Sequence, residues 1–290
     1  MSSFCITIYP STQEENMSRR PRNLQSNSYV HITQQCEFQE FLFSEPATRD
    51  HYLSLLKEVI AKFGLLVLGY CVMMNHIHLL IKVGSDATMV SKAMHSLAGR
   101  MARHYNLRAG RRGHFWRERF HSTHICSGRH FRNVISYIDA NSFNHKCGVD
   151  PIHWKYCSYH ELQTESQDIS IVDRVALIKA LRMQSIREFL VWQRNLMERQ
   201  TGRAPIIAAH GSLDYSGHYA IGMEAELQLL YKRLKKRGIY TYVQYLGLDS
   251  EGDPLWALNL CGQSYAERRR NQPFWAAKHC SSAKNTTDAK

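Results

Sequence analysis

The stretch that decides the fold runs from Gly69 to Val83 and reads GYCVMMNHIHLLIKV. Two apolar runs flank a short polar break at Asn75, a pattern that predicts two strands joined by a tight connection. His76 and His78 open the second strand. Because side chains two residues apart on a strand point to the same face, we expect both imidazoles to leave the sheet together.

The two histidines are typical of half a metal site. Imidazole is the commonest metal ligand near neutral pH, and two of them leave a divalent ion in need of at least one more ligand. In an arbitrary sequence the same spacing also occurs on a solvated face without any ligand role. Both interpretations stay open until the rest of the chain is considered.

The charge balance limits the class of partner. The 290 residues contain 37 Lys and Arg against 25 Asp and Glu, a formal net charge of +12. Such an excess favours a polyanionic partner, either nucleic acid or an acidic membrane surface. No apolar run approaches the roughly 20 residues needed to span a bilayer, and the eight cysteines form no CxxC pair. We therefore expect a cytoplasmic protein with reduced thiols and no membrane partner.

Apolar periodicity outlines the elements on both sides of the central stretch. Residues 1–26 are polar with little periodicity and are expected to form a disordered tail. In chain order, the expected elements are a strand near residues 29–32, a helix over 47–63, the two central strands, a helix over 87–107, a strand over 114–125 and a helix over 128–143.

This order predicts an α+β fold in which a ferredoxin-like antiparallel sheet carries packed helices. We assign that domain to residues 27–162. Helical periodicity continues over 168–200 and 223–237, without a catalytic motif. Residues 163–290 are therefore expected to form a mainly helical accessory region.

Basic residues concentrate between positions 87 and 138, where ten Lys and Arg stand against one acid, Glu118. The segment RAGRRGHFWRERF interleaves them with Phe115, Trp116 and Phe120. This combination predicts a groove that follows phosphates, with aromatic platforms for unstacked bases. The residues expected to bind DNA are Arg100, Arg103, Arg108, Arg111, Arg112, Trp116, Arg117 and Arg119.

The segment SYIDAN contains the remaining candidate group. Tyr137 and Asn141 are four residues apart and are therefore neighbours on one face of the predicted helix. Most helix tyrosines are amphipathic packing residues, so the tyrosine alone carries little functional information. Its spacing to Asn141, together with the upstream histidine pair, favours a nucleophile beside a metal.

In this order, GYCVMMNHIHLLIKV, RAGRRGHFWRERF and SYIDAN resemble the single-tyrosine HUH transposases, and within them the REP-associated tyrosine transposases, over about residues 28–160. The resemblance implies the HUH endonuclease type of fold. It also implies that Tyr137 is the catalytic nucleophile. His76, His78 and Asn141 would then bind Mg²⁺ or Mn²⁺.

The implied activity is that of a metal-dependent single-stranded DNA endonuclease and strand transferase acting in DNA transposition and recombination. A tyrosine hydroxyl can attack a phosphodiester if a metal ion polarises the nonbridging oxygens, and the resulting phosphotyrosine can be rejoined to another 3′ hydroxyl. The expected partner is single-stranded or hairpin DNA, bound by a monomer or a homodimer. One departure is that Ser142 follows Asn141, where family members usually have proline.

Two alternatives remain from the sequence. A hairpin-DNA-binding protein derived from a transposase would keep the fold and the basic groove but would have lost cleavage. A metal-independent 2H-type phosphodiesterase would use two His-x-Thr triplets, at 31–33 and 121–123. That interpretation leaves His76, His78 and Tyr137 without a role.

Overall fold

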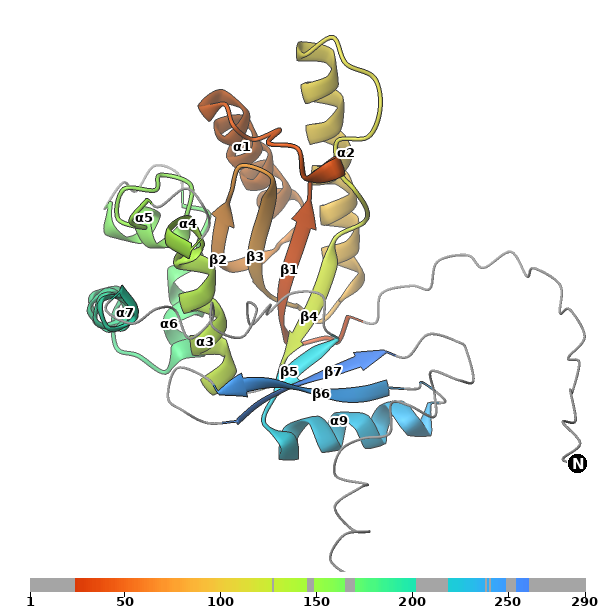
Figure 1. Cartoon of the computed structure of the whole chain (residues 1–290), viewed down its shortest axis with the longest axis vertical. Helices are drawn as coiled ribbons and strands as arrows, with labels where there is room; N and C mark the ends of the chain where they lie inside the picture. The colour runs from red at the N-terminus through yellow and green to blue at the C-terminus, as the bar shows by residue number, and fades with distance from the viewer. Residues whose placement is uncertain are drawn as a thin grey trace, which may run out of the picture.

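The computed structural model describes residues 24–126, 128–144, 149–164, 170–201, 219–237, 239, 241–248 and 254–260 (Figure 1). Nearly all of the tail expected over residues 1–26 lies outside these ranges.

The elements up to residue 139 follow the expected order. These are β1 (Tyr29–Gln35), α1 (Pro46–Phe63), β2 (Leu66–Val72), β3 (His76–Lys82), α2 (Thr88–Arg108), β4 (His121–Ile125) and α3 (Gly128–Asp139). The four strands lie in the order β2-β3-β1-β4, and every pair among them is antiparallel. The predicted ferredoxin-like α+β fold is confirmed.

Helices cover both faces of this sheet. Helices α1 and α2 pack against each other on one face, and α3 lies across the other (Figure 1). Because both faces are covered, β2 and β3 are buried almost along their whole length. Their sequences accordingly read as nearly continuous apolar runs interrupted by the two histidines.

Gly69 allows α3 to approach the sheet closely. A β-carbon built at this position would lie 2.2 Å from Cδ1 of Ile135 on α3, which is closer than atoms can pack. The register of β2 against β3 also shifts between Val67 and Gly69. Gly69 therefore sets the distance between α3 and the sheet.

The fourth strand is shorter than predicted. It begins at His121, whereas the prediction began at residue 114. Trp116 instead forms an isolated antiparallel bridge with Cys36, beyond the end of β1. The apolar character of residues 115–120 therefore reflects packing around a connection, and periodicity alone does not distinguish that from a strand.

The C-terminal region contains helices and also three strands that the sequence did not predict. Its elements are α4 (Asn141–Asn144), α5 (Ser158–Gln163), α6 (Arg174–Leu181), α7 (Ile186–Thr201), β5 (Ala220–Gly222), α9 (Glu224–Lys236), β6 (Thr241–Leu248) and β7 (Pro254–Leu260). Strand β5 runs parallel to β4 and extends the sheet to seven strands in the order β2-β3-β1-β4-β5-β7-β6. Within the described ranges, no helix is long and apolar enough to cross a membrane.

Candidate active site

His76 and His78 lie on the same face of β3, as their spacing predicts. Their rings are 4.9 Å apart between centroids and nearly perpendicular. His78 is buried, with 3% of its surface exposed, whereas His76 at the start of the strand is half-buried. Both belong to the face that α3 covers, because the ring of Tyr137 on α3 contacts that of His78.

Asn75 fixes the orientation of His76. The Oδ1 atom of Asn75 lies 2.6 Å from Nδ1 of His76, while its Nδ2 donates to the Gln39 carbonyl. An amide oxygen can only accept, so Nδ1 of His76 carries the proton. Nε2 of His76 therefore has a lone pair, which is the form of imidazole that binds a metal.

Tyr137 lies directly above the histidine strand. Its ring centroid is 5.6 Å from that of His78 and 6.1 Å from that of His31, and both contacts are edge-on. The side chain is half-buried. The fold thus brings together a tyrosine and a histidine pair that are about 60 residues apart in the chain.

Asn141 is linked to Tyr137 across the end of the helix. We expected both residues on one continuous helix, but α3 ends at Asp139 and Asn141 begins the short α4. The Nδ2 atom of Asn141 donates to the Tyr137 carbonyl at 2.8 Å, which keeps the spacing of one helical turn. The sequence departs from the tyrosine transposases at this point, because Ser142 follows Asn141 where they usually have proline. The break between α3 and α4 lies beside this departure.

A buried side-chain oxygen lies at the start of α4. Asn141 is fully buried, and none of the described residues donates a hydrogen bond to its Oδ1 atom. A buried polar atom left unsatisfied costs about 1–3 kcal/mol. One amide oxygen and two imidazoles form a donor set that suits Mg²⁺ or Mn²⁺, so the residue types present fit the expected ion. Among the described residues, no group of three His, Cys, Asp or Glu side chains is arranged to hold a metal.

The buried side chain of Asp139, which was not among the predicted site residues, anchors α3 from the side away from Tyr137's ring. Asp139 is fully buried and accepts hydrogen bonds from Ser158 Oγ at 2.6 Å, Tyr159 N at 3.1 Å and Gln193 Nε2 at 3.1 Å. Gln193 also accepts a bond from Ser136. These contacts join α3 to α5 and α7, so the accessory region helps to hold Tyr137 in place. Burial raises the pKa of Asp139 to about 7, although its three donors act in the opposite direction.

This pKa gives a prediction about stability. Between about pH 4 and pH 7 the folded chain keeps a proton on Asp139 that the unfolded chain has lost, so the free energy of unfolding should fall as pH rises. Relative to Asp139→Asn, the wild type should lose about 1.4 kcal/mol per pH unit in this interval. Urea unfolding at several pH values measures the difference. Asp50→Asn, at an exposed ion pair with Lys155, is the control that should leave the slope intact.

The fold neutralises part of the basic segment. Arg100, Arg108 and Arg111 form ion pairs with Glu58 at 2.5 Å, Glu45 at 3.1 Å and Glu40 at 2.9 Å. These three acids lie earlier in the chain than the basic segment, so a count of the charges within the segment does not include them. In the part of the chain that the structure describes, no such ion pair occurs for the other four predicted arginines, Arg103, Arg112, Arg117 and Arg119.

Two of the three expected aromatic platforms are core residues. Phe115 and Phe120 are 1% and 6% exposed, so the prediction that they stack on bases is wrong. Phe115 packs edge-on against Phe43 and Tyr105. The bridge between Trp116 and Cys36 holds the segment against the end of β1, and the two phenylalanines point into the core.

Trp116 itself is half-buried, and we predict that it matters first for stability. Its Nε1 donates to the Ala98 carbonyl at 3.1 Å, and its ring contacts Phe43 and Phe115. Trp116→Ala should lower the free energy of unfolding by about 3 kcal/mol. Trp116→Phe, which loses mainly the hydrogen bond, should cost about 1 kcal/mol. Chemical unfolding of both variants checks this; an unchanged stability in Trp116→Ala would restore the role in base stacking.

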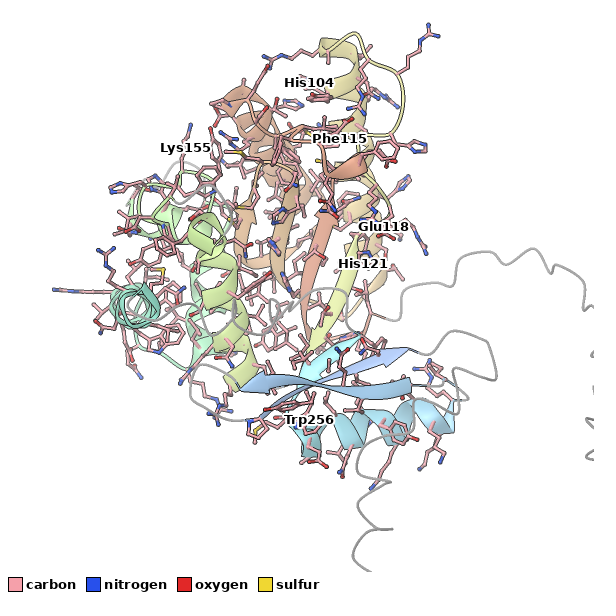
Figure 2. All side chains as sticks on the ribbon, in the orientation of Figure 1. His104, Phe115, Glu118, His121, Lys155 and Trp256 are labelled. Carbon is pink, nitrogen blue, oxygen red and sulfur yellow. The ribbon has the colours of Figure 1, made fainter. Side chains whose placement is uncertain are left out.

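Arg117, which has no ion pair among the described residues, lies at the end of β1, the strand beside β3. Gln35 is directly opposite His76 in the β1–β3 ladder, and Arg117 Nη1 lies 3.5 Å from Oε1 of Gln35. The exposed pair formed by His121 and Glu118, at 2.9 Å, lies at the start of β4 (Figure 2). The basic segment therefore leads to the end of the sheet at which His76 lies.

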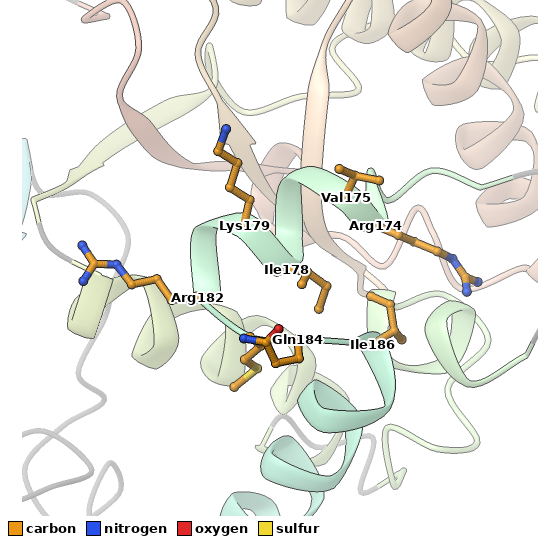
Figure 3. Close-up of a pocket in the computed structure, with 8 residues that line it drawn as sticks. Arg174, Val175, Ile178, Lys179, Arg182, Gln184 and Ile186 are labelled. Atoms are coloured by element: carbon orange, nitrogen blue, oxygen red, sulfur yellow. The ribbon is translucent and has the colours of Figure 1, made fainter.

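A pocket of about 580 Å³ lies elsewhere, on α6 and the turn into α7 (Figure 3). Apolar Val175, Ile178 and Ile186 line it together with Arg174 and Arg182. None of the side chains around Tyr137 contributes to this pocket. It is therefore separate from the candidate active site.

Part of the chain is similar to known proteins. Residues 24–141 match the family model described as transposase IS200 like. Among solved structures, the chain is similar to a REP-associated tyrosine transposase bound to a REP hairpin, with 16% identity, 51% of this chain and 87% of that chain covered, and a TM-score of 0.43. It is also similar to a protein from Deinococcus radiodurans R1 described as a transposase, with 16% identity, 42% and 96% covered, and a TM-score of 0.31. No curated protein matches the chain.

Proposed function

We propose that this chain nicks and rejoins single-stranded or hairpin DNA through a covalent phosphotyrosine at Tyr137, since residues 24–141 match the family model described as transposase IS200 like. The proposal is supported mainly by the edge-on contact between the rings of Tyr137 and His78, on the face of the sheet that also holds His76. The hydrogen bond from Asn141 to the Tyr137 carbonyl adds to this support. Each of these groups has a separate part in the reaction.

The bond changes follow from the nucleophile. The phenolic oxygen of Tyr137 loses its proton and forms a bond to phosphorus, the bond from phosphorus to the 3′ oxygen breaks, and that oxygen takes up a proton, so no net proton is gained or lost. In the reverse sense, another 3′ hydroxyl displaces the tyrosine and restores a phosphodiester. The free energy of the broken bond is kept in the phosphotyrosine, so rejoining requires no nucleotide cofactor.

His76, His78 and Asn141 would hold Mg²⁺ or Mn²⁺. The ion would supply Lewis-acid stabilisation for the negative charge that develops on the nonbridging phosphate oxygens. Asn75 holds His76 with Nε2 deprotonated, and Asn141 is oriented by its bond to the Tyr137 carbonyl. The hydrogen bond from Asn141 to the Tyr137 carbonyl would therefore link this proposed ligand to the proposed nucleophile.

A covalent-adduct assay tests the function directly. The full chain is incubated with a labelled single-stranded hairpin DNA and Mn²⁺, and the products are separated under denaturing conditions. We expect a DNA-protein band that protease treatment removes. Tight hairpin binding without any adduct or nicked product would instead support the alternative of a DNA-binding protein that has lost cleavage.

The unpaired arginines are expected to bind the phosphates of the substrate. Arg117→Ala should weaken affinity for single-stranded DNA and flatten the dependence of log affinity on log salt by about 0.7. Arg100→Ala should have a smaller effect, because Arg100 already forms an ion pair with Glu58. Salt titrations of both variants measure this; equal slopes for Arg117→Ala and the wild type would remove Arg117 from the DNA path.

The 2H-type alternative has one observation in its favour and one against it. Strands β1 and β4 place His31 opposite Thr123 and Thr33 opposite His121, so the two His-x-Thr triplets lie side by side. However, His31 is 1% exposed and its Nε2 is bonded to His78, whereas His121 is exposed and paired with Glu118. Two such different histidines are poorly suited to act together on one phosphodiester.

A further inference from the structure

A third histidine lies beside the proposed metal ligands. His31 on β1 is 1% exposed, and its Nε2 is 2.9 Å from Nδ1 of His78. Thr33, rather than His31, is directly opposite His78 in the ladder, so the two imidazoles meet across a diagonal of the sheet. Their planes are nearly parallel, at 17°, and the ring of Tyr137 contacts both edge-on.

The chemistry of this bond allows two arrangements with opposite consequences. If His31 donates, Nδ1 of His78 is the acceptor, and the neutral His78 ring carries its proton on Nε2, where it would block a metal. If His78 donates from Nδ1, its Nε2 keeps a lone pair, and His31 is the acceptor. Only the second arrangement is compatible with His78 as a ligand through Nε2.

We propose that His31 is a positioning residue that accepts the Nδ1 proton of His78 and thereby holds Nε2 of His78 ready for the divalent ion. The inference rests on the proposed function, because it assumes that His78 binds a metal. Asn75 does the same for His76, since its Oδ1 accepts from Nδ1 of that ring. Each of the two histidines then has its own acceptor, one from the adjoining residue and one from the neighbouring strand.

Packing alone does not account for a histidine at this position. A buried imidazole retains two polar nitrogens, and burying polar groups is favourable only when they are hydrogen-bonded. An apolar side chain would fill the space below α3 without this requirement. His31 is also unsuited to be a ligand through Nε2 itself, because that atom is engaged with His78.

The position of the proton is measured first, in the metal-free full chain. Nitrogen-15 NMR of the histidine rings distinguishes a protonated from an unprotonated ring nitrogen. We expect His78 to carry its proton on Nδ1 in the wild type and to lose this preference in His31→Phe. A wild-type His78 protonated on Nε2 would overturn the proposal, whatever the protein does to DNA.

Metal affinity is measured next, by titrating Mn²⁺ and following its paramagnetic resonance signal. His31→Phe keeps a ring but removes the acceptor, and it should weaken Mn²⁺ binding about 10- to 100-fold. His31→Gln, whose side-chain oxygen can accept the same proton, should recover part of the loss. The matched control is His124→Phe, which changes a buried histidine on the neighbouring strand that faces the opposite side of the sheet.

The possible results distinguish a wrong role for His31 from a wrong assignment of the metal site. Equal Mn²⁺ affinity in the wild type and in folded His31→Phe would overturn the role of His31 while leaving the metal site in place. A wild type that binds no Mn²⁺ would overturn both. Loss of affinity in His31→Phe with recovery in His31→Gln, at unchanged affinity in His124→Phe, is the result that the proposal expects.

Discussion

Tyr137→Phe is expected to abolish formation of the covalent DNA adduct while hairpin affinity stays within about twofold of the wild type. The phenylalanine ring keeps the edge-on contacts with His78 and His31, but the oxygen that forms the bond to phosphorus is gone. Loss of a nucleophile that acts with its neighbours as a unit costs at least about a thousandfold in rate. Denaturing gels of labelled hairpin DNA, together with an equilibrium binding titration, measure both properties.

Tyrosines elsewhere provide the control for this result. Tyr105→Phe changes a half-buried tyrosine at the far end of α2 that packs against Phe115 and should leave adduct formation unchanged. An adduct that persists in Tyr137→Phe would remove Tyr137 from its role. Tyr105, Tyr156 and Tyr159 would then be mapped by mass spectrometry of the adduct.

His78→Ala is expected to eliminate cleavage that depends on Mn²⁺ and to weaken Mn²⁺ binding by two orders of magnitude or more. The substitution removes a proposed ligand, and a divalent ion left with fewer protein ligands is held mainly by water. Asn141→Ala should reduce affinity less, and it should also relieve the cost of its buried amide oxygen. Calorimetric Mn²⁺ titration and single-turnover cleavage check these expectations.

The buried His124 again serves as the comparison. His124→Ala should lower stability, because it leaves a cavity beside Tyr219, but it should leave Mn²⁺ affinity unchanged. Cleavage that continues in excess EDTA, or that survives in His78→Ala, would show that the reaction needs no metal at these residues. The paired His-x-Thr triplets would then be tested by His121→Ala.

The sequence predicted the elements from β1 to α3 well because their signals are local. Helical spacing located α1 and α2 to within about a residue, and alternation around Ile77 placed both histidines on one face. The three strands β5, β6 and β7 were missed for the opposite reason. Their stability depends on pairing with β4 and with each other across long stretches of chain, and a short strand such as Ala220–Gly222 has no periodicity to detect.

The candidate site was predictable where residues lie close in sequence and only partly where the fold brings them together. Tyr137 with Asn141, and His76 with His78, follow from spacing. The pairing of His31 with His78 requires the register of β1 against β3, which the sequence does not specify. The burial of Asp139 was predictable from its spacing. It lies four residues after the apolar Ile135, which places its carboxyl group on the buried face of α3.

Strand β5 also has a consequence for the solubility of shortened chains. The backbone N–H groups of His124 and Cys126 donate to the carbonyls of Tyr219 and Ile221. A chain cut after residue 201 would retain Tyr137, His76, His78 and Asn141, yet it would uncover this row of donors and acceptors. An open strand edge is a template for pairing with another molecule, and the residues that cover the edge of β4 lie almost 80 positions beyond the last proposed ligand.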